Sequence, residues 1–258
     1  MPGSSNYPLG AGQSTPPMFI PRKKTTTREF ETGGFDDVSV RNDFIRKVYL
    51  ILFAQLTLTG GFITLCMLMP FVCLWIKQHP LFVYLSYGVF SAVYFTLVCC
   101  QSVRRTFPGN YLALLLFTLA FSYLAGAITC SYNTISVLIT VVITAATCLF
   151  VSIFALSTCV DFTRCTALFM VLSIALALFG ISCMVVYLVL GYNKILHTVY
   201  GGVAACVFVL YLVYDTQMIV GGRSHELSPE EYIFGAVQLY MDVMNLFLII
   251  LGLIGDRE

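Results

Sequence analysis

Two aspartates in the last third of the chain have the residue type and the setting that chemistry in a membrane requires. Asp215 closes one long apolar run and Asp242 lies in the middle of the next, and no other acid falls inside a run long enough to cross a bilayer. An acid at the centre of a membrane helix costs about 2.5–3.5 kcal/mol on insertion scales, so each one marks a candidate functional site. We therefore begin from this pair.

Polar residues recur beside both acids at helical spacing. Gln238, Asp242 and Asn245 stand at i, i+4 and i+7, and Tyr211 precedes Asp215 by four residues. Each set therefore lies on one helix face. Because lipid cannot satisfy polar groups, we expect this stripe to face other helices or water.

Helix geometry permits the two acids to meet but does not require it. Asp215 lies ~13 Å and Asp242 ~21 Å along their helices from the connecting loop. If they meet in a medium of low polarity, they should share a proton and titrate as a coupled pair, which would act as a pH sensor. Oxygen ligands of this kind suit a transiently bound Ca²⁺ ion. No His or Cys spacing indicates zinc, and we expect no resident cofactor.

Composition places the chain in a membrane. Of 258 residues, 59% are apolar and 10% are charged, against roughly 25% charged in soluble domains. The net charge of +1 gives no basic excess for nucleic acid, so the expected partner is the lipid bilayer.

Seven long apolar runs predict an all-α polytopic membrane protein, and we expect the seventh helix to be central in the bundle. The predicted spans are Phe44–Met69, Leu81–Val103, Asn110–Cys130, Thr134–Ser157, Thr166–Leu190, Leu196–Val220 and Pro229–Ile254. Residues 1–43 are rich in Gly, Ser, Pro and Thr, which predicts a disordered tail before a membrane domain over residues 44–258. At the start of the seventh span, Ser228, Pro229 and Glu231 predict an N-cap, a first-turn proline and a capping box.

The distribution of Lys and Arg predicts that the N-terminus is cytosolic. Seven lie before the first span or in its first turn, and the same side would carry Arg104, Arg105, Arg164 and Arg223, whereas the other side would carry Lys77, Lys194 and Arg257. The end of the chain then lies on the far side, unless the seventh span dips and returns.

Arg104 and Arg105 follow the second span and are candidate counter-ions that would latch onto the acid pair. The alternative is that they anchor the helix at the lipid surface. The ten cysteines lie mostly in apolar runs without any C-x-x-C, so we expect packing residues and no disulfide framework.

Four motifs give the chain a resemblance to a known family. They are Phe44-Ile45-Arg46-Lys47-Val48-Tyr49, Tyr214-Asp215-Thr216-Gln217, Ser228-Pro229-Glu230-Glu231-Tyr232-Ile233-Phe234 and Leu239-Tyr240-Met241-Asp242-Val243-Met244-Asn245-Leu246-Phe247. From Phe44 to Gly255 the chain resembles the transmembrane Bax-inhibitor-motif family, and its lifeguard branch most closely.

This resemblance implies a multi-spanning protein of Golgi or endoplasmic reticulum membranes, with plasma and endolysosomal membranes as alternatives. It also implies suppression of apoptosis and a pH-sensitive Ca²⁺ leak, with the family's di-aspartyl sensor on Asp215 and Asp242. In a bacterial relative an arginine after the second span latches onto the sixth-span acid, and Arg104 or Arg105 takes that place here. That relative's acid within the second span has no counterpart, because Leu81–Val103 contains no Asp or Glu.

Rival readings of the acid pair are weaker. An intramembrane aspartyl protease would carry Gly-x-Gly-Asp, where this chain has Leu239-Tyr240-Met241-Asp242, and no Pro-Ala-Leu follows. We therefore expect no enzyme. The serious alternative is a non-channel interaction protein that inhibits death signalling by binding apoptosis-regulatory membrane proteins. Its candidate surface is the small-residue face Gly201, Gly202, Ala205 and Cys206, although packing within the chain explains that face equally well.

Overall fold

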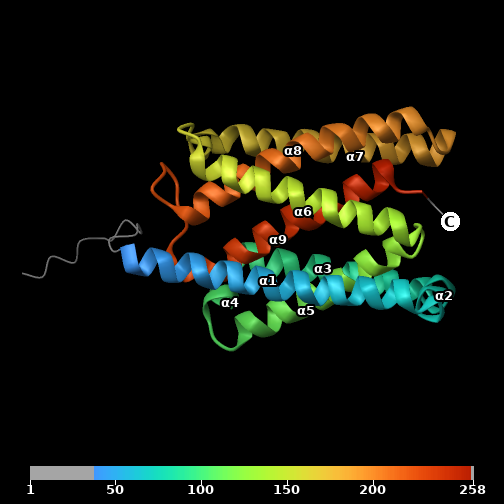
Figure 1. The fold of residues 1–258 in the computed structure, drawn as a ribbon, viewed down its shortest axis with the longest axis horizontal. Coiled ribbons are helices and arrows are strands. Elements are labelled where there is room, and N and C mark those ends of the chain that lie inside the picture. Colours follow the sequence, from blue (N-terminus) through green and yellow to red (C-terminus); the bar gives the residue numbers. More distant parts are fainter. Residues whose placement is uncertain (1–37, 257–258) are drawn as a thin grey trace, which may run out of the picture. The chain divides into compact units, whose positions relative to one another are not determined.

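Seven helices of the described chain are long and apolar enough to cross a membrane, as Figure 1 shows. The structure is a computed structural model that describes residues 38–256, so the prediction for residues 1–37 lies outside it. The spanning helices are α1 (Val38–Leu68), α3 (Pro80–Cys99), α5 (Gly109–Thr129), α6 (Thr134–Ser157), α7 (Thr166–Leu190), α8 (Lys194–Val220) and α9 (Tyr232–Ile254). The predicted all-α fold with seven spans is confirmed.

The first span begins earlier than the sequence predicted. Helix α1 starts at Val38 rather than Phe44, so the assignment of residues 38–43 to a disordered tail was wrong. No proline or glycine interrupts this segment, and the 31-residue helix is longer than a bilayer core of ~30 Å needs. The apolar run marked the embedded part of the helix, and not its full length.

Short helical elements complete the connections between spans. They are α2 (Pro70–Gln78), α4 (Gln101–Arg105) and two 3₁₀ turns, η1 (Phe162–Cys165) and η2 (Pro229–Glu231). Pro70 and Pro80 each open a helix, where a missing N–H costs little. The predicted second span ran to Val103, but the extended backbone at Cys100 separates α4 from α3.

Helix α9 is the centre of the bundle, as predicted. It packs against α8, α1, α6 and α5, and Ile233, Ala236, Val237, Tyr240 and Leu251 are wholly buried on it. The Tyr240 hydroxyl lies 2.8 Å from Thr59 Oγ1 of α1, which lies 2.8 Å from Ser122 Oγ of α5. A chain of hydroxyls therefore joins three helices inside an otherwise apolar core.

Helix α9 crosses the whole bundle and does not turn back. The Asn133 N–H donates to the Asp256 carbonyl over 3.0 Å, and the Asp256 N–H donates to Ser136 Oγ over 3.1 Å. The end of α9 therefore lies beside the α5–α6 turn, at the end of the bundle opposite the start of α1 (Figure 1). This arrangement excludes the dipping alternative for the seventh span.

One pair of cysteines is bonded, so the expectation that all ten serve as packing residues was wrong. Cys73 of α2 forms a disulfide with Cys130 at the end of α5. The separation of 57 residues hid the pair, because only the fold brings the short helix α2 against α5. Both cysteines lie on the side that carries few Lys and Arg, which was the available signal in the sequence.

Candidate functional site

Both acids lie in one cavity of about 490 Å³ between α3, α7, α8 and α9. Asp215 of α8 is 2% exposed and Asp242 of α9 is 5% exposed. The two carboxyl groups interact directly with each other. Because an ionised carboxylate can only accept a hydrogen bond, a hydrogen bond between the two acids would require a proton on one of them. The contact that helix geometry left open is therefore made.

The polar stripe predicted from helical spacing lines the same cavity. Gln238 and Asn245 of α9 and Tyr211 of α8 contribute to its wall. The Tyr211 hydroxyl donates to the Phe169 carbonyl over 2.6 Å and also contacts Ser173 Oγ. These bonds fasten α7 to α8 one helical turn from Asp215.

Three polar residues of the cavity escaped the sequence analysis. Tyr94 of α3, Ser173 of α7 and Tyr200 of α8 also line it. For Tyr94 and Ser173 the spacing relative to the acids carries no signal, because they belong to helices that only the tertiary fold brings to α8 and α9. Ser173 differs from the apolar residues around it, and this was the one local indication.

The cavity presents oxygen atoms that are not used by the protein. Asp242 Oδ2 is buried and has no hydrogen-bond partner in the described chain. Over residues 38–256 no three His, Cys, Asp or Glu side chains gather, so the acid pair is the site's carboxylate contribution. Such a set can hold a proton, or transiently accept a hard cation through oxygen ligands.

The two candidate latch arginines do not reach the acid pair in this structure. Arg104 Nε lies 2.6 Å from Glu231 Oε2, and Arg105 Nη2 lies 2.5 Å from Glu231 Oε1. The acid Asp242 lies eleven residues beyond Glu231, or ~16 Å along the helix. Both arginines instead clamp the Glu231 carboxylate, just before α9 begins, and neither pairs with the two aspartates.

The environment of Arg104 also differs from that of a lipid-surface anchor. Its side chain is 10% exposed, its Nη1 donates to the Val98 carbonyl over 2.9 Å, and its guanidinium lies 4.7 Å from the centre of the Phe234 ring. Arg105, whose side chain is 39% exposed, also pairs with Glu230 at 3.1 Å. Glu231 was predicted only as a capping-box acid.

The seventh span begins where the sequence predicted, but the predicted capping hydrogen bonds are not formed. Ser228 is the N-cap of η2 and Pro229 follows it, yet Ser228 makes no side-chain cap. Its Oγ is buried without a hydrogen-bond partner in the described chain. The capping box is not formed, because the Glu231 carboxylate points to the arginines instead.

A third acid ties two loops together at the same end of the bundle. Asp161 accepts from Thr163 Oγ1 over 2.6 Å and from Ser224 Oγ over 2.7 Å. These hydrogen bonds, with that from Thr163 foremost, hold the pKa of Asp161 well below its usual range. The α6–α7 and α8–α9 connections are thereby joined.

The small-residue face of α8 is used only in part within the chain. Gly201 is buried against α9, and a Cβ there would lie 2.6 Å from Leu253 Cδ2. A Cβ at Gly202 would meet no atom of residues 38–256 within 4 Å. Packing inside the bundle thus explains why a glycine is needed at position 201 but not why one stands at position 202.

The fold and site define a polytopic α-helical membrane protein with a buried pair of acids at the centre of its bundle. Residues 41–258 match the family model described as inhibitor of apoptosis-promoting Bax1, and the chain belongs to this family of anti-apoptotic membrane proteins.

Individual relatives agree with this assignment. The chain is 40% identical over 257 residues to protein lifeguard 3 of Homo sapiens, covering 100% of this chain and 80% of that protein. It is 38% identical over 262 residues to protein lifeguard 3 of Mus musculus, covering 98% of this chain and 84% of that protein. Bax inhibitor 1 of Schizosaccharomyces pombe is 30% identical over 217 residues, which are 84% of this chain and 77% of that protein. The resemblance to the lifeguard branch is confirmed.

Proposed function

We propose that this protein suppresses cell death as a proton-regulated Ca²⁺ leak, with Asp215 and Asp242 as its sensor. One observation carries the proposal. Two buried acids from adjacent helices interact inside a cavity whose polar lining includes Tyr211, Gln238 and Asn245. A leak of this kind lowers stored Ca²⁺ and so raises the threshold for death signalling.

The physical basis of regulation is the proton between the acids. With one proton the pair is a hydrogen bond that holds α8 against α9. Without it, two negative charges ~4 Å apart repel by about 4 kcal/mol at an effective dielectric of 20. Separation of the helices or entry of a cation relieves this repulsion. The leak should therefore open as pH rises and close as pH falls.

The orientation of the bundle in the membrane is inferred from the distribution of arginines and is supported by the disulfide. The end of the bundle with α4, η1 and η2 holds Arg104, Arg105, Arg164 and Arg223, which favours the cytosol. The other end holds Cys73–Cys130, a bond that persists in oxidising compartments. We propose a cytosolic N-terminus, Golgi or endoplasmic reticulum membranes, and no enzymatic role for the acids.

Ca²⁺ flux into liposomes between pH 6 and 8 tests this function. Wild-type flux should rise with pH, and Asp215→Asn or Asp242→Asn should abolish that rise, because neither variant retains a pair of ionisable acids. Asp43→Asn is the matched control, since Asp43 is exposed on α1 away from the cavity. Absence of wild-type flux, or an unchanged pH response in both variants, would contradict the proposal.

A second function is favoured by the open part of α8. Gly202, Ala205 and Cys206 are not fully buried, and such small residues allow close approach of another helix. On this proposal the protein inhibits death signalling by binding an apoptosis-regulatory membrane protein. Protection of cells that survives both aspartate substitutions but is lost in Gly202→Leu would favour binding over the leak.

A further inference from the structure

One tyrosine adjoins both the acid cavity and a second cavity. The second cavity, of about 290 Å³, lies between the facing ends of α7 and α8, and its lining includes Tyr187 of α7 and His197 of α8. We call it the α7–α8 cavity. Tyr200 of α8 lines both cavities. The two cavities therefore meet at the Tyr200 side chain.

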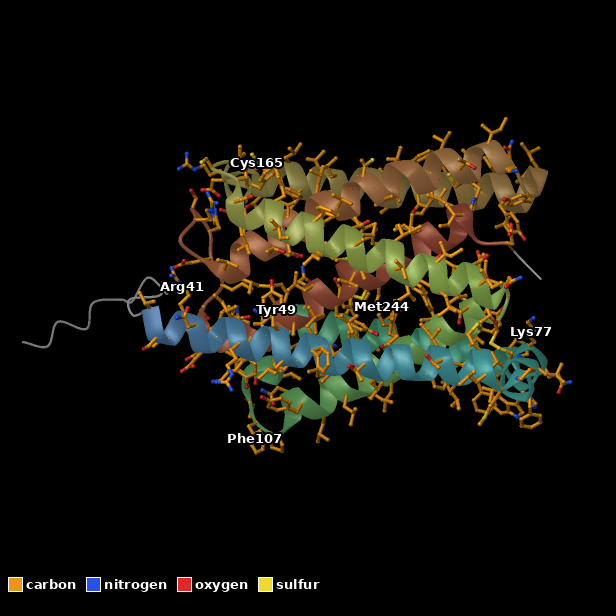
Figure 2. All side chains as sticks on the ribbon, viewed as in Figure 1. Arg41, Tyr49, Lys77, Phe107, Cys165 and Met244 are labelled. Atoms are coloured by element: carbon orange, nitrogen blue, oxygen red, sulfur yellow. A yellow bond between two sulfur atoms is a disulfide. The ribbon has the colours of Figure 1, made fainter. Side chains whose placement is uncertain are left out.

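The α7–α8 cavity reaches one end of the bundle. Gly191, Tyr192 and Asn193, which connect α7 to α8, belong to its lining. Figure 2 shows Lys77 at this end, whereas Cys165, next to the start of α7, lies at the opposite end. In the proposed orientation the connection faces the lumen. The cavity therefore borders the aqueous phase on that side.

Together the two cavities follow α8 through most of its length. Tyr200 lies six residues after Lys194, the first residue of α8, or ~9 Å along the helix. From Tyr200 the acid cavity extends past Phe208 to Asp215, fifteen residues or ~22 Å further. A route from the α7–α8 connection to Asp215 therefore passes from one cavity to the other at Tyr200.

Polar groups at the inner end of this route need an aqueous partner. Asp242 Oδ2 is buried and has no hydrogen-bond partner in the described chain, and Gln238 and Asn245 line the same cavity. Lipid cannot satisfy such groups. An acid pair that exchanges a proton or accepts a cation also has to communicate with water. A route to an aqueous phase is therefore required.

The other end of α8 is fastened to its neighbours. Gln217, two residues beyond Asp215, is 2% exposed. Its Nε2 donates to the carbonyls of Ala155 over 3.2 Å and Val160 over 3.0 Å, and its Oε1 accepts from the Phe162 N–H over 2.9 Å. These hydrogen bonds hold α8 against the α6–α7 connection. They favour the route through the α7–α8 cavity, where a single side chain stands between two cavities.

Tyr200 is positioned by packing on α7. The centre of its ring lies 5.4 Å from that of Phe179, in an edge-to-face arrangement. A Cβ at Gly180 would lie 2.9 Å from the Tyr200 hydroxyl oxygen, so the glycine makes room for the tyrosine to reach across to α7. Packing contacts of this kind are individually weak. A change of the χ1 rotamer would therefore swing the ring away from α7.

We propose that water and cations reach the acid pair from the end of the bundle that holds the α7–α8 connection, and that the Tyr200 ring closes this path. The inference rests on the proposed leak, to which it adds a lumenal entrance and a gating residue. At the inner end of the path, Asp215 and Asp242 supply the negative charge, which favours cations over anions.

A thiol placed beyond Tyr200 reports on the path without any need for ion flux. Asn245→Cys puts that thiol in the acid cavity. The probe is trimethylammonioethyl methanethiosulfonate, a cationic thiol reagent that does not cross lipid. In vesicles that expose their cytosolic face, reagent trapped inside should modify position 245 faster than reagent added outside. Mass spectrometry of the peptide that contains position 245 measures the rate, so the native cysteines do not interfere.

Substitutions of Tyr200 in the same background test the gate. A minor open state is populated at about 10% or less, so Tyr200→Ala should raise the rate from inside at least about tenfold. Tyr200→Phe keeps the ring and should label like the parent chain. Tyr187→Ala is the matched control, because Tyr187 lines the α7–α8 cavity but not the acid cavity.

Equal rates in Tyr200→Ala and Tyr200→Phe would overturn the proposal. Faster labelling from outside, or no labelling from inside in any variant, would overturn it as well. Thermal unfolding checks that each variant is folded. If the alanine variant is not, Tyr200→Leu takes its place, because it removes the ring and keeps an apolar side chain.

Ca²⁺ flux separates this inference from the leak on which it rests. Tyr200→Ala without the reporter thiol should raise Ca²⁺ flux into liposomes above that of wild type. Labelling at position 245 that follows Tyr200, with no flux in either chain, would support the path and contradict the leak. A pH-dependent wild-type flux that Tyr200→Ala leaves unchanged would overturn the gate and leave the leak in place.

Discussion

At the scale of single residues, Glu231 neutralises two arginines where α9 begins. Its side chain is 7% exposed and faces Arg104, which is 10% exposed, and Arg105, which is 39% exposed. Removing one partner of a buried ion pair leaves an uncompensated charge, whose cost exceeds the modest net gain of the intact pair. The integrity of this end of α9 should therefore depend on one carboxylate.

We predict that Glu231→Gln lowers the free energy of unfolding by about 3–5 kcal/mol, because it leaves Arg104 buried without its counter-charge. The neighbouring substitution Glu230→Gln should cost about 0–1 kcal/mol, since the Glu230 side chain is 70% exposed. Denaturant unfolding in detergent micelles measures both. Equal losses in the two variants would show that the clamp on Glu231 does not stabilise the fold.

The sequence identified some residues of the site and not others for a physical reason. Asp215 and Asp242 stand out because an acid in an apolar helix is costly wherever it occurs. The partner of Arg105 is 126 residues away, and its choice depends on how far α4 and η2 reach along the bundle. Charge alone therefore suggested a latch to the acid pair, whereas the structure pairs both arginines with Glu231.

At the scale of elements, Asp161 joins the loop before α7 to the loop before η2. It accepts from the Ser224 N–H over 3.1 Å and from the Thr163 N–H over 3.1 Å, in addition to both hydroxyls. The first connection packs against α8, which carries Asp215, and the second follows α8 directly. A change in Asp161 should therefore alter loop stability without touching the acid cavity.

The pKa of Asp161 is lowered on folding, chiefly by its hydrogen bond from Thr163. A lowered pKa adds stability that is fully present above the unfolded value of about 3.9 and is lost only as pH falls through the folded pKa. We predict that Asp161→Asn lowers stability equally at pH 6, 7 and 8. Unfolding at the three pH values measures this.

The same substitution separates the role of the loops from that of the proposed sensor. The pH dependence of Ca²⁺ flux in Asp161→Asn should match that of wild type, because Asp161 stays ionised throughout this range. A flux response that shifts with Asp161→Asn would instead assign part of the pH sensing to the loops. Asp43→Asn again serves as the control for removal of an acid outside the cavity.

Elements were predictable where the bilayer sets their length. A run of about 20 apolar residues has to cross as a helix, since backbone groups in lipid must bond within the segment. The helices α2 and α4 lie outside that constraint. At Cys100 the backbone is extended, and Arg104 in the next turn is buried against Glu231. That break depends on tertiary packing, which the pattern of apolar residues does not contain.

At the scale of the whole molecule, the two ends of the bundle differ in charge and in thiol chemistry. The end with α4 and η1 carries four exposed free cysteines, which are Cys99, Cys100, Cys159 and Cys165. The other end carries the Cys73–Cys130 disulfide. Free thiols suit the reducing cytosol and a disulfide suits an oxidising lumen. This asymmetry agrees with the orientation derived from Lys and Arg.

Thiol labelling in sealed vesicles that expose their cytosolic face tests the orientation directly. A membrane-impermeant maleimide should modify the protein without permeabilisation, and replacing Cys99, Cys100, Cys159 and Cys165 by serine should remove that labelling. Cys73 and Cys130 should become reactive only when an impermeant reductant is added together with detergent, because in the proposed orientation their bond faces the lumen. Labelling of these four cysteines only after detergent would show that the bundle has the opposite orientation in the membrane. The proposed leak would then face its arginine-rich end toward the store, and the cytosolic assignment of the N-terminus would be wrong.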